Sequence, residues 1–273
     1  LGINWIENRI YKPTLDEILY GAFTDETPNT YYAKEMRYPK EGGYFNFIKE
    51  IVESAEKEKK IHYRKRAKSI DYKNRVITFE DGKIITYSEL YSSIPLNEIT
   101  QLVSGIPREL QEKAKSLEYT GVALVSIGFN RIIECEKLWF YFYDKDILAA
   151  RAYLPSLKSV KNTPQNCSSI QFEIYFNSKE EIPTEKICVK NCLYTLKKIG
   201  IATERDIVCI DYRIVDYANV IFRKDSEQIA DEIKEWLRGK GIIPIGRFGE
   251  WKYFWSDQAF LSGYNAVKKG NIK

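Results

Sequence analysis

Residues 242–263 read IIPIGRFGEWKYFWSDQAFLSG, and this stretch decides the fold. Its apolar start predicts a short buried strand, and Gly246 and Gly249 allow a tight turn directly after that strand. A helix then opens near Asp257 and is expected to continue to Lys269. The first turn of a helix directs unpaired N–H groups and a partial positive charge at whatever precedes it, which suits a pyrophosphate. An ordinary turn and helix cap would give the same pattern, so the stretch needs support from elsewhere in the chain.

The sequence pattern of residues 107–222 is typical of an antiparallel sheet with helices of its own. Long runs of aromatic and β-branched residues, broken at Asn130 and Arg131, predict paired strands. The expected strands cover 119–129, 132–143, 168–176 and 206–222, with helices through Lys115 and over 184–198, the latter ending at Gly200. An amphipathic helix over 226–237 then leads back to the stretch quoted above.

The segment before residue 107 combines helices with a hairpin. A helical pattern follows Thr14, and a second helix is expected over 42–58. The pair Asp81-Gly82 between two β-type runs is a strong hairpin signal. Strands are expected over 61–70, 75–79, 84–87 and 91–96, followed by a helix over 96–103.

The composition is that of a globular protein with a sizeable core. The 273 residues are 44% hydrophobic and contain no run of about 18 apolar residues, so a transmembrane helix is excluded. The amino terminus lacks a secretory signal, and we expect a cytoplasmic protein. The five cysteines are an odd number and are expected to be reduced, while a single histidine, His62, argues against a histidine-rich metal site.

The charge balance does not demand a nucleic-acid partner. Lys and Arg outnumber Asp and Glu by 42 to 38, which leaves a net charge of +4. The most basic run, 57–68, is explained by a solvated helix end followed by an edge strand, with nucleic-acid binding as the weaker alternative.

Three segments, taken together, resemble the carboxy-terminal portion of the FAD-dependent oxidoreductases of the amine oxidase, protoporphyrinogen oxidase and UDP-galactopyranose mutase superfamily. The first is RYPKEGG at 37–43, which precedes a helix. The second is the hairpin block 61–96, which ends in YSELYSSIPL. The third is GRFGEWKY at 246–253, followed by Asp257 and Ser262-Gly263. Each segment is weak alone, but three in this order are fairly specific.

The resemblance implies an FAD cofactor and assigns residues to its site. Gly42 and Gly43 would lie beside the flavin, where a side chain would collide with it, and Ala67 is nearest to a position whose backbone contacts adenine. The implied cofactor-binding residues are Gly42, Gly43, Ala67, Pro95, Gly246, Arg247, Trp251, Tyr253 and Asp257.

The same resemblance places Arg151 over the substrate pocket and Tyr217 on a strand that enters it. An arginine there would clamp a carboxylate or phosphate by paired hydrogen bonds, although a surface ion pair explains Arg151 equally well. The sequence assigns no catalytic residue.

A complete member of this superfamily begins with a strand-turn-helix that carries G-x-G-x-x-G and holds the FAD pyrophosphate. That motif is absent from this sequence. The segment Gly239-Lys240-Gly241 follows a helix and has Pro244 at the sixth position. Because the sequence at Leu1 reads like the middle of a longer chain, we expect an N-terminal dinucleotide-binding segment or subunit as a partner.

We therefore expect an α+β fold in which part of a FAD-binding domain, with a mixed sheet, hairpin and helices, is interleaved with an antiparallel-sheet substrate domain. The expected division is a helical segment of the substrate side at 1–30, FAD-domain segments at 31–104 and 223–273, and the substrate domain at 105–222. The expected function is that of the C-terminal part of a flavin-dependent oxidoreductase acting on a small molecule such as a nucleotide sugar or an amine. The alternatives are a non-redox flavin-dependent sugar-nucleotide mutase and a non-catalytic binding subunit of a split flavoenzyme.

Overall fold

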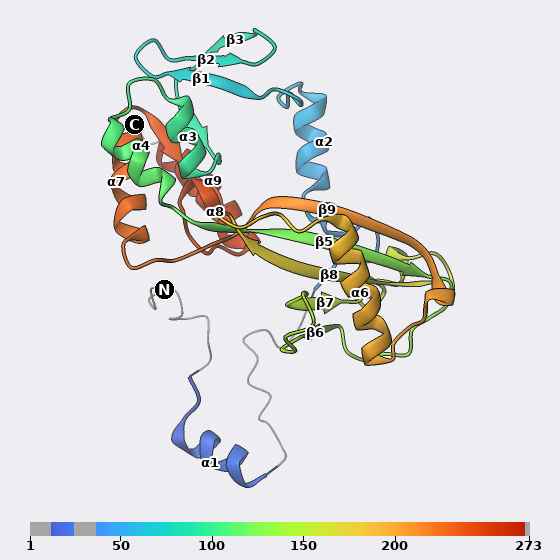
Figure 1. Ribbon diagram of the computed structural model, residues 1–273. Coiled ribbons are helices and arrows are strands. Elements are labelled where there is room, and N and C mark those ends of the chain that lie inside the picture. The colour runs from blue at the N-terminus through green and yellow to red at the C-terminus, as the bar shows by residue number, and fades with distance from the viewer. Residues whose placement is uncertain (1–11, 25–36, 271–273) are drawn as a thin grey trace.

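The structure is a computed structural model that describes residues 12–24 and 37–270 (Figure 1). Within these residues it combines helices with parallel and antiparallel sheets, which confirms the expected α+β class. Helix α1 (Leu15–Phe23) begins after Thr14, whose hydroxyl accepts a hydrogen bond from the backbone N–H of Glu17. The Glu17 carboxylate accepts the Thr14 N–H in return, which forms a capping box.

The largest sheet is five-stranded and antiparallel. Its strand order is β6-β7-β8-β5-β9. The strands are β5 (Tyr119–Phe129), β6 (Trp139–Tyr141), β7 (Arg151–Tyr153), β8 (Ser168–Asn177) and β9 (Ile207–Val220). The register places Val125 of β5 opposite Phe172 of β8 and Tyr212 of β9. Short helical turns, α5 (Pro155–Lys158) and η3 (Val160–Asn162), connect β7 to β8, and η4 (Glu204–Asp206) precedes β9.

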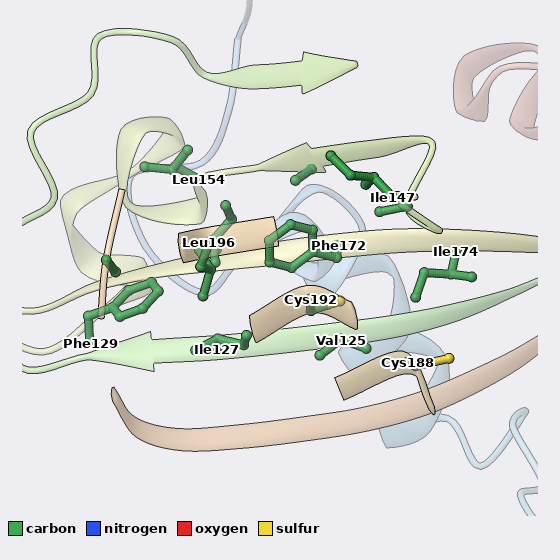
Figure 2. Close-up of a cluster of buried hydrophobic side chains, with 14 of the residues drawn as sticks. Val125, Ile127, Phe129, Ile147, Leu154, Phe172, Ile174, Cys188, Cys192 and Leu196 are labelled. Atoms are coloured by element: carbon green, nitrogen blue, oxygen red, sulfur yellow. The ribbon is translucent and has the colours of Figure 1, made fainter. Parts of the chain in front are cut away.

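One face of this sheet is covered by helix α6 (Glu185–Ile199), as Figure 1 shows. Successive strand residues point to opposite faces, so Val125 and Ile127 of β5 share the face toward α6, where both are fully buried. Cys188 and Cys192 of α6 belong to the same core, together with Phe172 of β8 (Figure 2). The residues of β5 that alternate with these two point to the opposite face of the sheet, where they are available to line a site.

The hairpin lies in a separate three-stranded antiparallel sheet formed by β1 (Ala67–Asp71), β2 (Val76–Phe79) and β3 (Ile84–Thr86). Gly82 in the turn between β2 and β3 has φ +80°, a conformation that favours glycine. Before the hairpin come the 3₁₀ turn η2 (Tyr44–Phe47) and helix α2 (Lys49–Lys57).

A parallel pair of strands, β4 (Leu90–Ser92) and β10 (Ile242–Pro244), brings together two segments that are far apart in the sequence. The helices around this pair are α3 (Leu96–Leu102), α4 (Arg108–Lys115), α7 (Ser226–Arg238), α8 (Gly246–Gly249) and α9 (Ser256–Gly270). A second core, distinct from that of the large sheet, includes Ile99, Ile233 and Trp251. It unites residues that are far apart in sequence, and the four-part division of the chain stays a prediction.

Several predicted strands are shorter than the sequence suggested, because a strand extends only as far as its partner. The strand expected over 61–70 begins at Ala67, which pairs with Phe79, the last residue of β2. The strand expected over 132–143 is reduced to β6, since its partner β7 has three residues. The strand expected over 91–96 covers Leu90–Ser92, where the pairing with β10 ends.

Other differences concern turns and helices. The predicted helix over 42–58 is divided into η2 and α2, and Gly43 before η2 has φ +65°. The glycine turn at 246–249 is a short helix, α8. Strand β7 was not predicted, because three residues are too few to show a period.

Candidate functional site

The parallel strands β4 and β10 end at the same edge, and this edge carries the first half of the site. Ser92 lies opposite Pro244 at the last step of the pairing. The chain leaves β4 through Pro95 into α3 and leaves β10 through Gly246 into α8. Ligands of open α/β sheets bind outside the carboxyl ends of parallel strands, where such loops and helix starts converge.

Gly246 needs to be glycine, because its φ of +73° is strained for residues with a side chain. Its N–H donates to Ser262 Oγ of α9 at 2.8 Å, and the Ser262 hydroxyl in turn donates to the Glu250 carboxylate. Gly249 is required for a different reason. A Cβ at that position would lie 2.7 Å from the carbonyl oxygen of Ser92, so α8 packs directly on the end of β4.

Arg247 joins this edge to the large sheet. Its Nε donates to the carbonyl of Phe254 at 2.8 Å, and one Nη donates to the carbonyl of Ala218 in β9 at 3.0 Å. The guanidinium also lies over the ring of Tyr253, 4.8 Å from the centroid. Arg247 therefore holds the segment after α8 against β9.

Trp251 is a backbone outlier inside the second core. The residue is 2% exposed and has φ +55°, an uncommon conformation for a bulky residue. Within the described part of the chain, neither the buried Trp251 Nε1 nor the buried Asn97 Oδ1 has a hydrogen-bond partner. Unsatisfied polar atoms are uncommon in protein interiors, so these two atoms point to a ligand or water at this edge.

Tyr217 lies at this edge as well. Its hydroxyl accepts a hydrogen bond from Asn97 Nδ2 at 2.9 Å, and its ring stacks on Tyr119 with 4.0 Å between centroids. Phe248 of α8 meets the same ring edge-on at 5.2 Å. Burial, followed by the hydrogen bond with Tyr119, raises the pKa of Tyr217, so it stays a neutral phenol at physiological pH.

Helix α9 begins at Ser256, and Asp257 lies exposed in its first turn. The N–H groups of a first turn have no acceptor within the helix itself. The side-chain oxygen of Gln258 accepts the N–H of Trp255 at 2.9 Å, just before the helix. This helix start follows Tyr253 closely, as the sequence predicted.

The second half of the site is a cavity of about 390 Å³ on the face of the large sheet opposite α6. It contains Arg151 and Tyr153 of β7, which flank the core residue Ala152, and residues of β5 and β8 with the same orientation. The complete lining consists of Val122, Leu124, Trp139, Arg151, Tyr153, Lys158, Gln171, Glu173 and Tyr175. The volume is sufficient for a small metabolite.

Arg151 and Glu173 form a two-pronged ion pair within the cavity. Arg151 Nη2 donates to Glu173 Oε1 at 2.8 Å, and Nε donates to Oε2 at 3.1 Å. The Tyr175 hydroxyl donates to Oε2 at 2.6 Å. Burial alone would lower the pKa of Arg151, but the bonds and the charge of Glu173 outweigh it and raise that pKa.

Tyr253 packs beneath the guanidinium of Arg247. It lies close enough to Tyr175 to contribute to the raised pKa of that phenol, after the larger effects of burial and of Glu173. Its other neighbour is Arg247, which is anchored to β9. Tyr253 does not itself line the cavity, but it lies on the side of Arg247 from which the segment after α8 leads toward β9.

The structure brings some of the predicted residues together and separates others. Pro95, Gly246, Arg247 and Trp251 gather at the edge of β4 and β10, and Arg151 lines the cavity. Tyr217 does not line the cavity with Arg151, and Ala67 begins strand β1 of the hairpin sheet. Their assigned roles stay predictions.

Gly42 and Gly43 lie in a segment that touches α5. The hydroxyl of Ser159, directly after α5, donates to the carbonyl of Lys40, and Lys158 Nζ lies 5.6 Å from the centroid of the Tyr38 ring. Gly42 has φ +76°, and a Cβ there would come within 3.3 Å of the Asn46 side chain.

Sequence reasoning missed Lys158, Glu173 and Tyr175. Glu173 and Tyr175 alternate with buried residues in β8, and that period of two was visible in the sequence. Lys158 gave no signal, because only the fold brings α5 to the cavity.

A larger hollow of about 1140 Å³ lies beside α6 and includes Val189, Leu193 and Ile207. None of the residues singled out from the sequence lines it. In the described ranges, no group of three or more His, Cys, Asp or Glu side chains is arranged to bind a metal. Among residues 12–24 and 37–270, no helix combines the length and apolar character needed to cross a bilayer.

Comparison with solved structures finds proteins of similar fold. The structure of reduced UDP-galactopyranose mutase matches with a TM-score of 0.82 and 20% identity, over 92% of this chain and 56% of that chain. A protein from Exiguobacterium sp. assigned as a protoporphyrinogen oxidase matches with a TM-score of 0.54 and 12% identity, over 72% of this chain and 44% of that one. A CLA-producing fatty acid isomerase from P. acnes matches with a TM-score of 0.52 and 14% identity, over 75% of this chain and 47% of that one.

This chain thus spans about half the length of the solved structures that it matches. Residues 2–214 also match the sequence model of the family described as flavin containing amine oxidoreductase, and this match includes the hairpin, the cavity and most of the large sheet. The chain belongs to the flavin-containing amine oxidoreductase family.

Proposed function

We propose that this chain forms the substrate pocket and part of the FAD site of a flavin-dependent oxidoreductase. Membership of the family implies a flavin cofactor, and FAD is the form proposed here. The observation that supports the proposal best is the shared edge of β4 and β10, where the left-handed Gly246 follows a strand end and precedes the start of α9. A parallel edge with a helix start beside it is the usual setting for a dinucleotide.

The residues at this edge fit such a group. The buried atoms Trp251 Nε1 and Asn97 Oδ1 find no hydrogen-bond partner among the described residues, and the backbone at Gly246 carries no side chain to fill the space before it. The residues proposed to hold the cofactor are Pro95, Gly246, Arg247, Trp251, Tyr253 and Asp257, with Gly42, Gly43 and Ala67 as further candidates.

A bound flavin would supply hydride or electron transfer, which none of the protein's own side chains provides. The chain's part is to position the substrate in the cavity beside Arg151 and to hold Tyr253 under Arg247 next to the strand edge. Arg247, through its bonds to β9, keeps these two halves at a fixed spacing. Tyr175, bonded to Glu173, stays protonated and presents a neutral wall.

We further propose that a dinucleotide-binding segment or subunit completes the site. Parallel sheets are normally covered on both faces and extended by further strands, whereas β4 and β10 form a pair of three residues each. Helix α9 also exposes an apolar stripe, which consists of Phe260, Leu261, Tyr264 and Val267. A cytoplasmic location is part of the same proposal.

A non-redox nucleotide-sugar mutase is the second candidate. The similarity to reduced UDP-galactopyranose mutase over 92% of this chain favours it. Turnover that requires reduced flavin but consumes no electron acceptor would identify a mutase, whereas consumption of an acceptor would identify an oxidoreductase. A chain that binds no flavin, even with the completing segment, would be the non-catalytic subunit.

The proposed flavin site is tested by titrating the purified chain with FAD and recording the flavin absorbance between 350 and 500 nm, roughly the range of its two bands. We expect a saturable spectral shift that Gly246→Val weakens, because a β-branched residue is strained at positive φ. Gly263→Ala is the matched control, since a Cβ there would make an ordinary contact of 3.8 Å with Ile245. Equal titration curves for all three proteins would refute the proposed site.

A further inference from the structure

We infer that Lys158 makes the cavity on the large sheet an anion-binding pocket, so that the substrate carries a phosphate or carboxylate group and is not an amine. This inference rests on the proposed function, in which the cavity is the substrate pocket. It depends on which charges of the cavity are already paired and which are available to a ligand.

Glu173 is the carboxylate that lines the cavity, and its hydrogen-bonding capacity is already in use. Its two oxygens accept three bonds of 2.7 to 3.1 Å from Arg151 and a fourth of 2.6 Å from Tyr175. The Glu173 side chain is 10% exposed. An ammonium ligand would have to displace Arg151 from this buried carboxylate, which would leave a guanidinium unpaired.

Lys158 is a second cation of the same cavity, and it is not neutralised. Its Nζ lies over the ring of Tyr153, 4.2 Å from the centroid. Among the residues that the structure describes, no carboxylate lies within 4.0 Å of this ammonium group. Since Arg151 and Glu173 cancel one another, the cavity carries one excess positive charge at Lys158.

The surroundings of Lys158 favour the binding of an anion to its ammonium group. Burial lowers the pKa of Lys158, and the nearby Arg151 lowers it further, while the charge of Glu173 opposes them with a smaller effect. Glu173 is itself bonded to Arg151, so the ammonium ion has lost hydration without gaining a directly paired carboxylate. An oxyanion in the cavity would replace that hydration and relieve the repulsion between the two cations. A cationic amine would increase the repulsion.

The remaining walls suit the organic part of such a ligand. Trp139 and Tyr153 offer aromatic surfaces, and Gln171 offers an amide whose Nε2 donates to Ser126 Oγ at 2.8 Å. The cavity of about 390 Å³ admits a small molecule with one planar or sugar-like group next to its anion.

The inference is tested by calorimetric titration of the purified chain with three probes: phenyl phosphate, malonate and benzylamine. We expect the unmodified chain to bind at least one of the two anions and not the amine, and the stronger anion identifies phosphate or carboxylate as the preferred group. Lys158→Gln should weaken anion binding about tenfold or more, as expected for a lost charge-assisted hydrogen bond. Lys158→Arg keeps the charge and should keep most of the affinity.

Lys161→Gln is the matched control. It removes the same charge three residues further on, from an exposed side chain of η3 that does not line the cavity. Circular dichroism of each variant establishes that it is folded. The inference is overturned by equal anion affinity in Lys158→Gln and Lys161→Gln, by absence of anion binding to the unmodified chain, or by binding of benzylamine.

The same samples separate this inference from the proposed function. Gly246→Val should weaken FAD binding and leave the binding of phenyl phosphate in the cavity unchanged. Lys158→Gln should weaken the binding of phenyl phosphate and leave FAD binding unchanged. If the unmodified chain binds no FAD but the anion results are as expected, only the flavin role is refuted. If Lys158→Gln keeps its anion affinity, the role of Lys158 is refuted.

Discussion

Glu118 lies directly before β5, where the chain passes from the second core into the large sheet, and it is 6% exposed. Its carboxylate accepts hydrogen bonds from Arg223 at 2.6 Å and from Lys179 at 2.6 Å. These bonds lower the pKa of Glu118 from 4.5 to about 2, and the bond from Arg223 has the larger effect. A carboxylate whose pKa is depressed in the folded state stabilises the protein above its unfolded pKa and loses that effect as the pH falls.

We therefore predict that Glu118→Gln lowers the free energy of unfolding at pH 7 by roughly 2 kcal/mol, the size of hydrogen bonds to charged groups. The difference from the unmodified chain should shrink as the pH falls from about 4.5 toward 2. Urea unfolding at a series of pH values measures it. Glu112→Gln, which removes an exposed pair with Lys115, is the control and should change little. A gap that stays constant from pH 6 to pH 3, roughly the accessible range, would contradict the assignment.

Gly249 gives a second prediction for a single residue. Because its Cβ would lie 2.7 Å from a backbone oxygen of β4, Gly249→Ala should lower the free energy of unfolding by about 1–3 kcal/mol, the usual cost of overpacking. Gly263→Ala in α9 meets only ordinary contacts and should be neutral or stabilising. Thermal unfolding of the two variants measures the difference, and an equal effect would mean that α8 does not pack on β4 as described.

Single residues were predicted from the sequence where a motif marked them. Gly246 and Arg247 stood in a recognisable segment, and both lie at the edge of the parallel pair. Arg151 was found by its neighbours in sequence, but its partner Glu173 was not. The pairing of β7 with β8 is a long-range contact that no local pattern contains.

At the scale of an element, helix α6 presents Cys188 and Cys192 to the sheet, four residues apart and both fully buried. Burial raises the pKa of Cys192 to about 12, and the pKa of Cys188 is raised for the same reason. Cys209 on β9 is exposed. Since the thiolate is the reactive form, both burial and pKa protect the helix cysteines.

We predict that iodoacetamide modifies Cys209 of the native protein well before Cys188 and Cys192, as followed by peptide mass spectrometry. In guanidinium chloride all three should react at similar rates, which provides the control. Rapid modification of Cys192 in the native protein would mean that α6 does not cover the sheet.

The alternation of β5 gives a matched pair of substitutions. Ile127 is fully buried toward α6, whereas Leu124 points to the opposite face and lines the cavity. Ile127→Ala should lower the free energy of unfolding by about 2–5 kcal/mol, and Leu124→Ala should cost clearly less. Urea unfolding measures both, and equal costs would contradict the assignment of faces.

Elements were predictable where the signal was long and repeated. Strand β5, with eleven residues, matched its predicted range of 119–129, and α7 extended one residue beyond its predicted end. Strand β6 fell far short of 132–143, because the number of residues that its partner offers decides its length. Partner length is a property of the sheet and not of the strand.

At the scale of the whole molecule, the chain enters the large sheet from the second core through β5 and returns to that core after β9. Tyr119 and Tyr217, which stack on one another, mark this crossing. The sequence predicted the α+β class and the resemblance to a flavoprotein. It did not predict the cavity, because a cavity forms only when distant segments such as α5 and β8 meet.

The central claim is that the edge of β4 and β10 holds part of a flavin site. The most direct measurement is hydrogen exchange, followed by mass spectrometry, of the purified chain with and without excess FAD. The account predicts slower exchange in the segment after β4 around Pro95 and in the segment from Gly246 to the first turn of α9, with the outer surface of α6 unchanged. Protection that is absent from both segments, or confined to other parts of the chain, would contradict the claim.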